Sequence, residues 1–444
     1  MGFHGNGEEE WNSKGHKFTP HACGVNLKHL MRPLHIAFFN RSFYPDTAAT
    51  GQLLTELCEG LARQHGCRIS VVAGVPLLPA GGAGSEMRGQ RLVERRDYCG
   101  MTVLRARGTR FSKRRFSGRF SNYVSYFLSA CYAGLKLDRP DVVVALTDPP
   151  IIGLAAYLAA RRFRIPLVMS YRDIFPEAAR LLEDFHSETV NRALQAVNCF
   201  LVQKAERSIA LGETMRKRLI EGKGAPPERV VVIPDWADCR DIVPVSKQNA
   251  FARAHGLAEK FVVMHSGNIG LSQGLDVLVE AAVRLQAFPE IVVVFVGEGV
   301  KKAALEGQTR ALGLQNVRFL PYAPKERLAE SFASADVFIV SLKKGLSGVI
   351  VPSKLYGVLA AGRPYVAVVE EDCEVTAVTR QYDCGLLATP GDPADLAEKI
   401  LTLYRDQARA ERLGRNARRA ALQFDRGPQV EKYFTLFQQL TTPR

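Results

Sequence analysis

Short apolar runs rich in Val and Ile alternate along this chain with longer amphipathic stretches. Such runs are typical of strands buried on both faces of a parallel sheet, and the stretches between them have the spacing of helices that cover it. In the first half of the chain, strands are predicted at residues 34–39, 68–73, 141–146, 166–170, 196–202 and 229–233. Helices are predicted between them at residues 51–64, 151–162 and 213–221. The alternation therefore predicts an α/β fold with a doubly wound sheet.

A second series of the same kind follows the Pro- and Asp-rich turn at residues 233–238. Its predicted strands are at residues 261–266, 291–297, 317–320, 337–341 and 365–369. Its predicted helices are at residues 273–285, 301–312, 325–334, 354–361 and 392–406. The two series repeat an architecture and together predict two Rossmann-like units. Open α/β sheets bind ligands beyond the carboxyl ends of their strands, so we expect a cleft between the two units to hold the site.

The length of 444 residues exceeds what one hydrophobic core usually serves. We expect a first domain at residues 31–240 and a second at residues 241–407. Residues 408–444 are basic and helical in pattern, and they are expected to cross back onto the first domain. Residues 1–30 are expected to be a disordered extension, because the periodic apolar sequence begins only at Met31.

The bulk composition argues against several classes of protein. No apolar run approaches the ~20 residues that a membrane-spanning helix needs, and residues 1–30 lack the order of a signal peptide. The nine cysteines are scattered without metal-ligand spacing, which indicates free thiols in a reducing cytoplasm. The net charge of +14 leaves nucleic acid, an anionic membrane and a phosphorylated substrate open as partners.

The segment at residues 265–276 joins a predicted strand to a predicted helix through a glycine-containing loop. Its glycines, Gly267, Gly270 and Gly274, allow a ligand to approach the backbone closely, and free N–H groups in such a loop favour phosphate. The segment matches neither GxGxxG nor a P-loop. A phosphate-binding loop and a plain tight turn between strand and helix are both open from the sequence.

A second segment, at residues 345–364, places a Gly/Ser loop before another predicted helix. Ser353 is the expected N-cap of this helix, and Lys354 follows it directly. A lysine there can add a full positive charge next to a diphosphate. The alternative is an ordinary capped helix with a solvated lysine.

Six short motifs occur in a fixed order along the chain: DTAATGQ at 46–52, RDIFPE at 172–177, IPDWAD at 233–238, SGN at 266–268, VPSK at 351–354 and AGRP at 361–364. In this order they resemble the family-four retaining glycosyltransferases with the GT-B fold. The resemblance is greatest to the branch that builds bacterial capsule, O-antigen and colanic-acid-type exopolysaccharide, and it covers about residues 31–406. It implies two Rossmann-like doubly wound domains that face a central cleft.

The resemblance also implies roles for individual residues. In the second domain, the implied donor-binding residues are Gly267, Asn268, Gln273, Glu298, Tyr322, Ser353 and Lys354. In the first domain, the loop that leads into Gly51 would approach the reacting sugar. Asp173 would contact the acceptor or the transferred sugar; a capping role in the next turn is its alternative.

The chain departs from the family pattern at several of these positions. Asn268 and Gln273 stand where many relatives have Arg and Lys. The two positions of the family's Glu-x7-Glu pair fall on Val349 and Gly357, and Gly357 has no side chain to grip a ribose. These changes put the usual phosphate and ribose contacts in doubt, and Lys354 is the candidate for the missing charge.

Residues 101–137 contain eight Lys or Arg and no Asp or Glu, with aromatic residues between them. Cations beside aromatics suit an anionic lipid surface, single-stranded nucleic acid, or simply a solvated loop followed by a core helix. We expect a membrane surface, because the resemblance implies a lipid-linked acceptor. The residues expected to contact the membrane or the lipid acceptor are Arg110, Lys113, Arg114, Arg115 and Arg119.

The sequence thus predicts a retaining hexosyl- or N-acetylhexosaminyltransferase that uses a nucleoside-diphosphate sugar and a polyprenyl-diphosphate-linked saccharide. No metal and no further cofactor are indicated, and we expect a cytoplasmic protein peripheral to the inner face of the membrane. One alternative is a nucleotide-sugar 2-epimerase, which would need converging acid and base groups. The other is a basic nucleic-acid-binding protein, for which no recognition motif is present.

Overall fold

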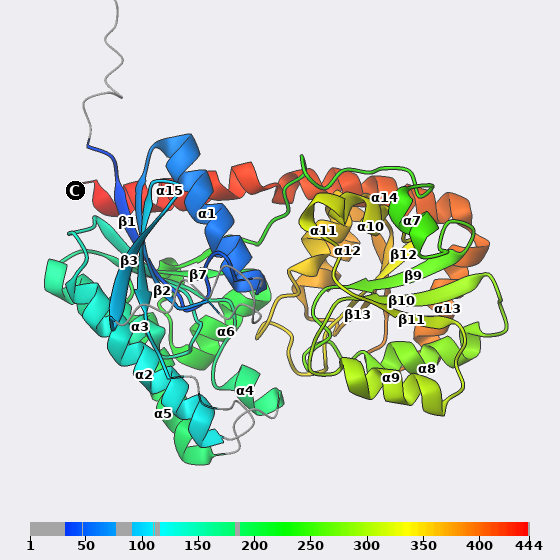
Figure 1. Cartoon of the computed structure of the whole chain (residues 1–444), viewed down its shortest axis with the longest axis horizontal. Helices are drawn as coiled ribbons and strands as arrows, with labels where there is room; N and C mark the ends of the chain where they lie inside the picture. The colour runs from blue at the N-terminus through cyan, green and yellow to red at the C-terminus, as the bar shows by residue number, and fades with distance from the viewer. Residues whose placement is uncertain are drawn as a thin grey trace, which may run out of the picture. The chain divides into compact units, whose positions relative to one another are not determined.

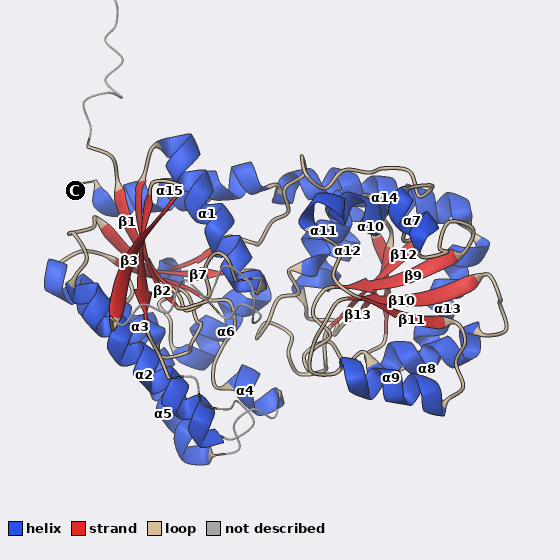
Figure 2. Ribbon diagram, viewed as in Figure 1, coloured by secondary structure: helices blue, strands red, loops and turns tan. Residues whose placement is uncertain are grey.

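Two sheets built mainly of parallel strands organise the chain (Figures 1 and 2). The computed structural model describes residues 32–46, 48–76, 91–109, 111, 116–182 and 187–442. Leu34–Arg444 form one compact unit. The expectation for residues 1–30 lies outside the described residues.

The first sheet has eight strands in the order β3-β4-β2-β1-β5-β6-β7-β8. All neighbours are parallel except β3 and β4, which form an antiparallel hairpin. The strands are β1 (His35–Phe39), β2 (Arg68–Gly74), β3 (Val93–Tyr98), β4 (Met101–Ala106), β5 (Val142–Ala145), β6 (Leu167–Ser170), β7 (Arg207–Ala210) and β8 (Val230–Val232).

Helices cover both faces of this sheet because its strands are buried on both sides. Along β1, Ile36 and Phe38 pack in one cluster with α1 (Ala49–His65), and Ala37 and Phe39 pack in another with the opposite layer. That opposite layer consists of α2 (Phe116–Leu135), α3 (Ile152–Phe163), α5 (Glu188–Lys204) and α6 (Glu213–Lys223). The short α4 (Glu177–Leu181) precedes α5.

The second sheet has six parallel strands in the order β11-β10-β9-β12-β13-β14. The strands are β9 (Phe261–Ser266), β10 (Ile291–Val296), β11 (Val317–Leu320), β12 (Val337–Ser341), β13 (Tyr365–Val368) and β14 (Gly385–Ala388). The helices are α7 (Ala250–Ala254), α8 (Asp276–Leu285), α9 (Lys302–Ala311), α10 (Leu328–Ala333), α11 (Lys354–Ala360), α12 (Glu374–Tyr382) and α13 (Pro393–Arg405). The doubly wound α/β fold class predicted from the sequence is therefore confirmed.

The last two helices belong to different layers of the structure. α14 (Gln407–Ala421) contacts α11 beside the second sheet, whereas α15 (Arg426–Thr441) contacts α1 on the first. Phe437 of α15 meets Phe38 of β1 edge to face, with ring centroids 6.3 Å apart. Where α15 begins, Arg426 pairs with the buried Asp238 at 2.8 Å. The chain thus ends on the first sheet.

One predicted strand is wrong. Residues 196–202 lie inside α5, where the buried Leu194, Asn198 and Leu201 recur at helical spacing. The apolar run resembled a buried strand because its outward side includes Ala196 and Phe200 in place of charged residues. The strand of this unit is β7, which the sequence analysis missed, as it missed the β3–β4 hairpin, α12 and β14.

Two further observations concern the described residues alone. No helix among them combines the length and the apolar character needed to cross a bilayer. The eight cysteines in this part of the chain are all free thiols.

Candidate functional site

Backbone hydrogen bonds join the loops that follow β9 and β10 at the carboxyl edge of the second sheet. Gly267 N donates to Val296 O at 2.9 Å, and Ile269 N donates to Glu298 O at 2.9 Å. A Cβ on Gly297 would lie 2.0 Å from Gly267 O, and Gly297 has a φ of 148°. Only glycine at position 297 allows this close approach, so the shape of the predicted phosphate loop at Gly267 depends on Gly297.

Replacing Gly297 with alanine should therefore displace the Gly267 loop. We expect the free energy of unfolding to fall by ~1–3 kcal/mol, since the added methyl group must be accommodated against backbone at an unfavourable φ. Gly307 is the matched control, because a Cβ there meets nothing within 4 Å inside α9. Gly307→Ala should stabilise by up to ~1 kcal/mol. Chemical denaturation of both variants tests the contrast, and equal stability of the two would show that the loop does not need Gly297.

Lys354, the first residue of α11, brings its charge to the Gly267 loop. Its Nζ lies 3.2 Å from Nε2 of His265, the buried penultimate residue of β9. A Cβ on Gly267 would lie 3.8 Å from the same Nζ. The two segments singled out from the sequence therefore meet at one place.

Ser353 stands at the N-cap position of α11, as predicted, but its side chain does not cap the helix. Ser353 has helical torsions (φ −61°, ψ −22°), and its side chain makes no capping hydrogen bond. α11 contains only seven residues, so its macrodipole is a small source of positive charge. The charge available to an anion here is that of Lys354.

Burial perturbs both charged groups at this point. It lowers the pKa of Lys354 to about 7. Burial, and then the neighbouring Lys354, lowers the pKa of His265 well below its usual value. Within the described part of the chain, no carboxylate lies within ion-pair distance of Lys354. A half-buried ammonium without a counterion is stabilised by an arriving anion, which is the property a diphosphate site requires.

Two predicted donor-binding residues hold the loop itself. Oε1 of Gln273 accepts a hydrogen bond from Gly270 N at 2.9 Å, and its Nε2 donates to Ser272 Oγ at 2.7 Å. Asn268 is exposed beside them. In this arrangement Gln273 shapes the loop, and Asn268 is the amide that remains open to a ligand.

Glu298 and Tyr322 lie on the rim of the same sheet edge. Tyr322 is half exposed, and its hydroxyl lies 3.5 Å from Glu298 O. The Glu298 carboxylate pairs with Lys302 at 2.7 Å. The Glu298 backbone and the Tyr322 ring face the Gly267 loop, whereas the Glu298 carboxylate pairs with a side chain of α9.

Asp173 follows β6 at the carboxyl edge of the first sheet. Its N–H and that of Arg172 both donate to Oγ1 of Thr147, at 3.3 and 3.1 Å. Burial raises the pKa of Asp173 to about 6 against the opposing effect of Arg172, and Asp148 and Asp235 add to the rise. A carboxyl group with this pKa changes charge close to physiological pH.

The Asp173 segment pairs with the backbone that leads into α11. Asp173 and Ile350 form an isolated antiparallel bridge, and Ile174 N donates to Val349 O at 3.0 Å. Backbone hydrogen bonds therefore connect the loop expected to act on the acceptor with the segment that leads to Lys354, which is expected to hold the donor.

A buried ion pair fixes the base of the Asp173 loop. Arg172 hydrogen-bonds to Asp235, and both side chains are buried. Asp235→Ala would leave the guanidinium buried without a partner, and we expect a loss of ~3–5 kcal/mol of stability. The exposed pair of Arg380 and Glu371 provides the control, since Glu371→Ala should cost less than ~1 kcal/mol. Denaturant midpoints measure both effects, and similar costs for the two would refute the structural role of the buried pair.

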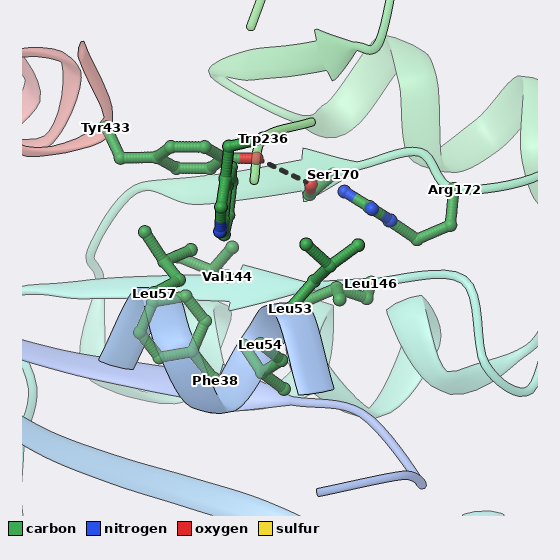
Figure 3. A pocket seen from close by; sticks show the side chains of 10 residues that line it. All are labelled: Phe38, Leu53, Leu54, Leu57, Val144, Leu146, Ser170, Arg172, Trp236 and Tyr433. Atoms are coloured by element: carbon green, nitrogen blue, oxygen red, sulfur yellow. Dashed lines mark hydrogen bonds between the residues drawn. The ribbon is translucent and has the colours of Figure 1, made fainter. Parts of the chain in front are cut away.

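A small cavity borders this ion pair beneath α1 (Figure 3). Its volume of about 10 Å³ leaves room for one water at most, so it cannot take a sugar. It is lined by Phe38, Leu53, Leu54, Leu57, Val144, Leu146, Ser170, Arg172, Trp236 and Tyr433. Side chains from α1, α15 and three strands therefore close the space behind Arg172.

Gly51 lies buried in the first turn of α1. A Cβ there would come within 3.2 Å of the backbone carbon and Cβ of Ser42. Its lack of a side chain lets α1 start directly against the loop that follows β1. Gly51 is thus placed to set the shape of that loop.

Two family models divide the chain between them. The model described as "Glycosyl transferase 4-like domain" matches residues 49–236, and "Glycosyl transferases group 1" matches residues 247–420. The chain belongs to the family-four glycosyltransferases. The probable glycosyltransferase WbjE of Pseudomonas aeruginosa is 29% identical over 62% of this chain and 68% of WbjE. The putative colanic acid biosynthesis glycosyl transferase WcaI of Escherichia coli is 25% identical over 77% of this chain and 85% of WcaI.

Solved structures show the fold of this glycosyltransferase. A crystal structure of Anabaena HepE in complex with UDP and glucose superposes with a TM-score of 0.71 at 19% identity, over 92% of this chain and all of the other. Sucrose-phosphate synthase from Thermosynechococcus elongatus gives a TM-score of 0.72 at 17% identity, over 92% and 99%. The fold is GT-B, as the sequence motifs implied.

Sequence reasoning missed a polar cluster in the glycosyltransferase at the ends of β1 and β5. Arg41 pairs with Asp148 at 3.1 Å, and Ser42 Oγ donates to the same carboxylate at 2.8 Å. Each of these residues stands just past a correctly predicted strand. The signal that could have identified these residues was their place at the carboxyl ends of predicted strands, because β5 lies beside β6, the strand that Asp173 follows.

The predicted lipid contacts of the glycosyltransferase are mostly outside its described part. Arg110, Lys113, Arg114 and Arg115 lie outside the described residues, and Arg119 lies in α2 with a side chain that is not described. Among the described residues, no group of three or more His, Cys, Asp or Glu is arranged to hold a metal ion.

Proposed function

We propose that this glycosyltransferase moves a hexosyl or N-acetylhexosaminyl group, with retention, from a nucleoside-diphosphate sugar to a polyprenyl-diphosphate-linked saccharide in cell-surface polysaccharide biosynthesis. The observation that carries the donor side is Lys354, whose Nζ lies without a carboxylate partner beside the Gly267 loop at the end of β9. Two similar proteins support the wider role: WcaI is described by colanic acid biosynthesis, and HepE was crystallised with UDP and glucose.

The chemical requirement is stabilisation of the negative charge that develops on the leaving diphosphate. In the proposed mechanism, the backbone N–H groups after His265 and the Lys354 ammonium meet this charge. The acceptor hydroxyl attacks from the side of the departing phosphate, which takes up the hydroxyl proton. Asp173 contacts the acceptor or the transferred sugar, and no metal ion or protein nucleophile takes part.

The protein is proposed to work in the cytoplasm on the inner face of the membrane, where a lipid-linked acceptor and a soluble nucleotide sugar are both within reach. Nucleic acid has no part in this proposal. The net charge of +14 is instead assigned to anionic lipid and to the phosphate groups of both substrates.

A panel of nucleotide sugars tests the proposal directly. We expect one donor to raise the melting temperature of the purified protein, because a ligand that binds only the folded state stabilises it. With a lipid-linked saccharide added, that donor should yield an elongated glycan with retained anomeric configuration. A free epimerised sugar nucleotide would instead identify a 2-epimerase. Steeply salt-dependent binding of DNA or RNA without any donor effect would identify a nucleic-acid-binding protein.

A further inference from the structure

Three helices of the first domain expose large apolar side chains on one face. Leu128, Tyr132 and Leu135 of α2 are 61%, 42% and 53% exposed, and they fall on one stripe at positions i, i+4 and i+7. Leu158 of α3 is 54% exposed. Phe200 of α5 is also exposed. A surface helix of a water-soluble domain normally carries polar residues along such a stripe.

The exposed residues form one continuous surface. A Cβ on Gly134 of α2 would lie 3.5 Å from Cβ of Ala159, so α2 and α3 cross closely where Leu135 and Leu158 emerge. The rings of Tyr157 and Phe200 then link α3 to α5, with centroids 5.0 Å apart. The apolar face is defined as Leu128, Tyr132, Leu135, Tyr157, Leu158 and Phe200. These helices lie side by side over one side of the first sheet (Figure 1).

The charges that α2 and α3 place next to the apolar face are positive. Neither α2 nor α3 contains an Asp or Glu. Arg161 and Arg162 are exposed at the end of α3. Lys136 follows α2 and lies 4.5 Å from the Tyr132 ring centroid. Apolar and aromatic side chains with cations beside them fit the interface of an anionic bilayer, where rings and alkyl groups enter and cations stay at the headgroups.

We propose that the apolar face of α2, α3 and α5 is the surface by which this protein lies on an anionic lipid bilayer. A second copy of the chain fits the same face poorly, because a two-fold contact would bring Arg161 and Arg162 of both copies together. The purpose of the surface rests on the proposed lipid-linked acceptor, but binding to a bilayer can be measured without any transfer reaction.

Vesicle flotation of the full-length protein tests the proposal. Phosphatidylcholine vesicles with and without phosphatidylglycerol serve as probes for the wild type and for Leu128→Gln/Leu135→Gln/Leu158→Gln. Partitioning of this triple variant should fall at least about tenfold, because three exposed leucines no longer enter the bilayer. Arg161→Gln/Arg162→Gln should weaken binding to the anionic vesicles alone, by about fivefold per charge.

Val283→Gln/Leu312→Gln is the matched control, since both residues are exposed and apolar but lie in the second domain. It should float like the wild type. Vesicle binding that is unchanged in the triple variant would overturn the proposal, as would a wild-type dimer that the triple variant converts to a monomer in sedimentation. Nucleoside diphosphate binding should be normal in every variant. If neither the wild type nor any variant bound the nucleoside diphosphate, this would count against the proposed function and not against this surface. Should the triple variant fail to fold, the arginine pair decides.

Discussion

Replacing Lys354 with methionine is expected to weaken binding of the nucleoside diphosphate about 100-fold, as is usual when one partner of a desolvated charge pair is removed. Lys354 is the cation that the described residues bring to the Gly267 loop, and α11 adds little positive charge because it is short and Ser353 does not cap it. Calorimetric titration of wild type and variant with the diphosphate of the preferred donor measures the change.

The same substitution should make the protein more stable. The folded pKa of Lys354, about 7, lies below its unfolded value, so the unfolded chain binds the proton more readily. The penalty is full below pH 7 and disappears as the pH rises toward the unfolded pKa. Lys354→Met should therefore stabilise by on the order of 1–2 kcal/mol at neutral pH, less than the full shift because Lys354 retains some exposure, and by less at higher pH.

Lys344→Met is the control for both effects, because Lys344 is exposed in the loop after β12. It should leave diphosphate affinity and stability near the wild-type values. Lys354→Arg should restore part of the affinity, since it keeps a positive charge, although its larger planar group fits the place less well. Full diphosphate affinity in Lys354→Met would remove this residue from the donor site.

Replacing Asp173 with asparagine is expected to lower kcat by about 10²–10⁴, the usual effect of losing a positioned carboxylate that acts in the transition state. The donor affinity should be almost unchanged, because Asp173 belongs to the first sheet and the diphosphate is proposed to bind at Lys354. Steady-state kinetics with the lipid-linked acceptor, together with donor titration, separate the two effects.

The pH dependence of kcat/KM gives a second test of both residues. Activity should rise as Asp173 ionises near pH 6 and fall as Lys354 loses its proton near pH 7 in the free enzyme. The rising limb should vanish in Asp173→Asn, and the falling limb should move to higher pH in Lys354→Arg. Asp138→Asn, an exposed change near β5, should keep both limbs. An Asp173→Asn enzyme with full kcat would exclude a role for this carboxylate in the reaction.

Much of the fold was predictable because its strands are buried on both faces. In β1, β5, β9 and β10 polar residues stand only at the strand ends, and each run predicted its strand within about a residue. The same logic failed at residues 196–202, where a helix with Ala196 and Phe200 on its outer side also reads as a continuous apolar run. The edge hairpin β3–β4 was missed because exposed charged residues fill β3.

The candidate site was predictable where glycine or a lone charge carried the signal. Gly267 and Lys354 meet as the motifs implied, although they are far apart in sequence. The roles of Ser353 and Gln273 could not be predicted. Whether such a polar side chain caps a helix, stabilises a loop or contacts a ligand depends on backbone torsions that the sequence does not give. Asp148 was missed since its partner Arg41 follows a different strand, and only the sheet order brings the two together.

In the proposed donor site, the diphosphate binds where Lys354 meets the Gly267 loop. Titrating the nucleoside, its monophosphate and its diphosphate into wild type and Lys354→Met tests it most directly. We expect wild-type affinity to rise steeply from nucleoside to diphosphate and this rise to be largely lost in the variant. An equal rise in both proteins, or wild-type binding of the nucleoside as tight as that of the diphosphate, would contradict it.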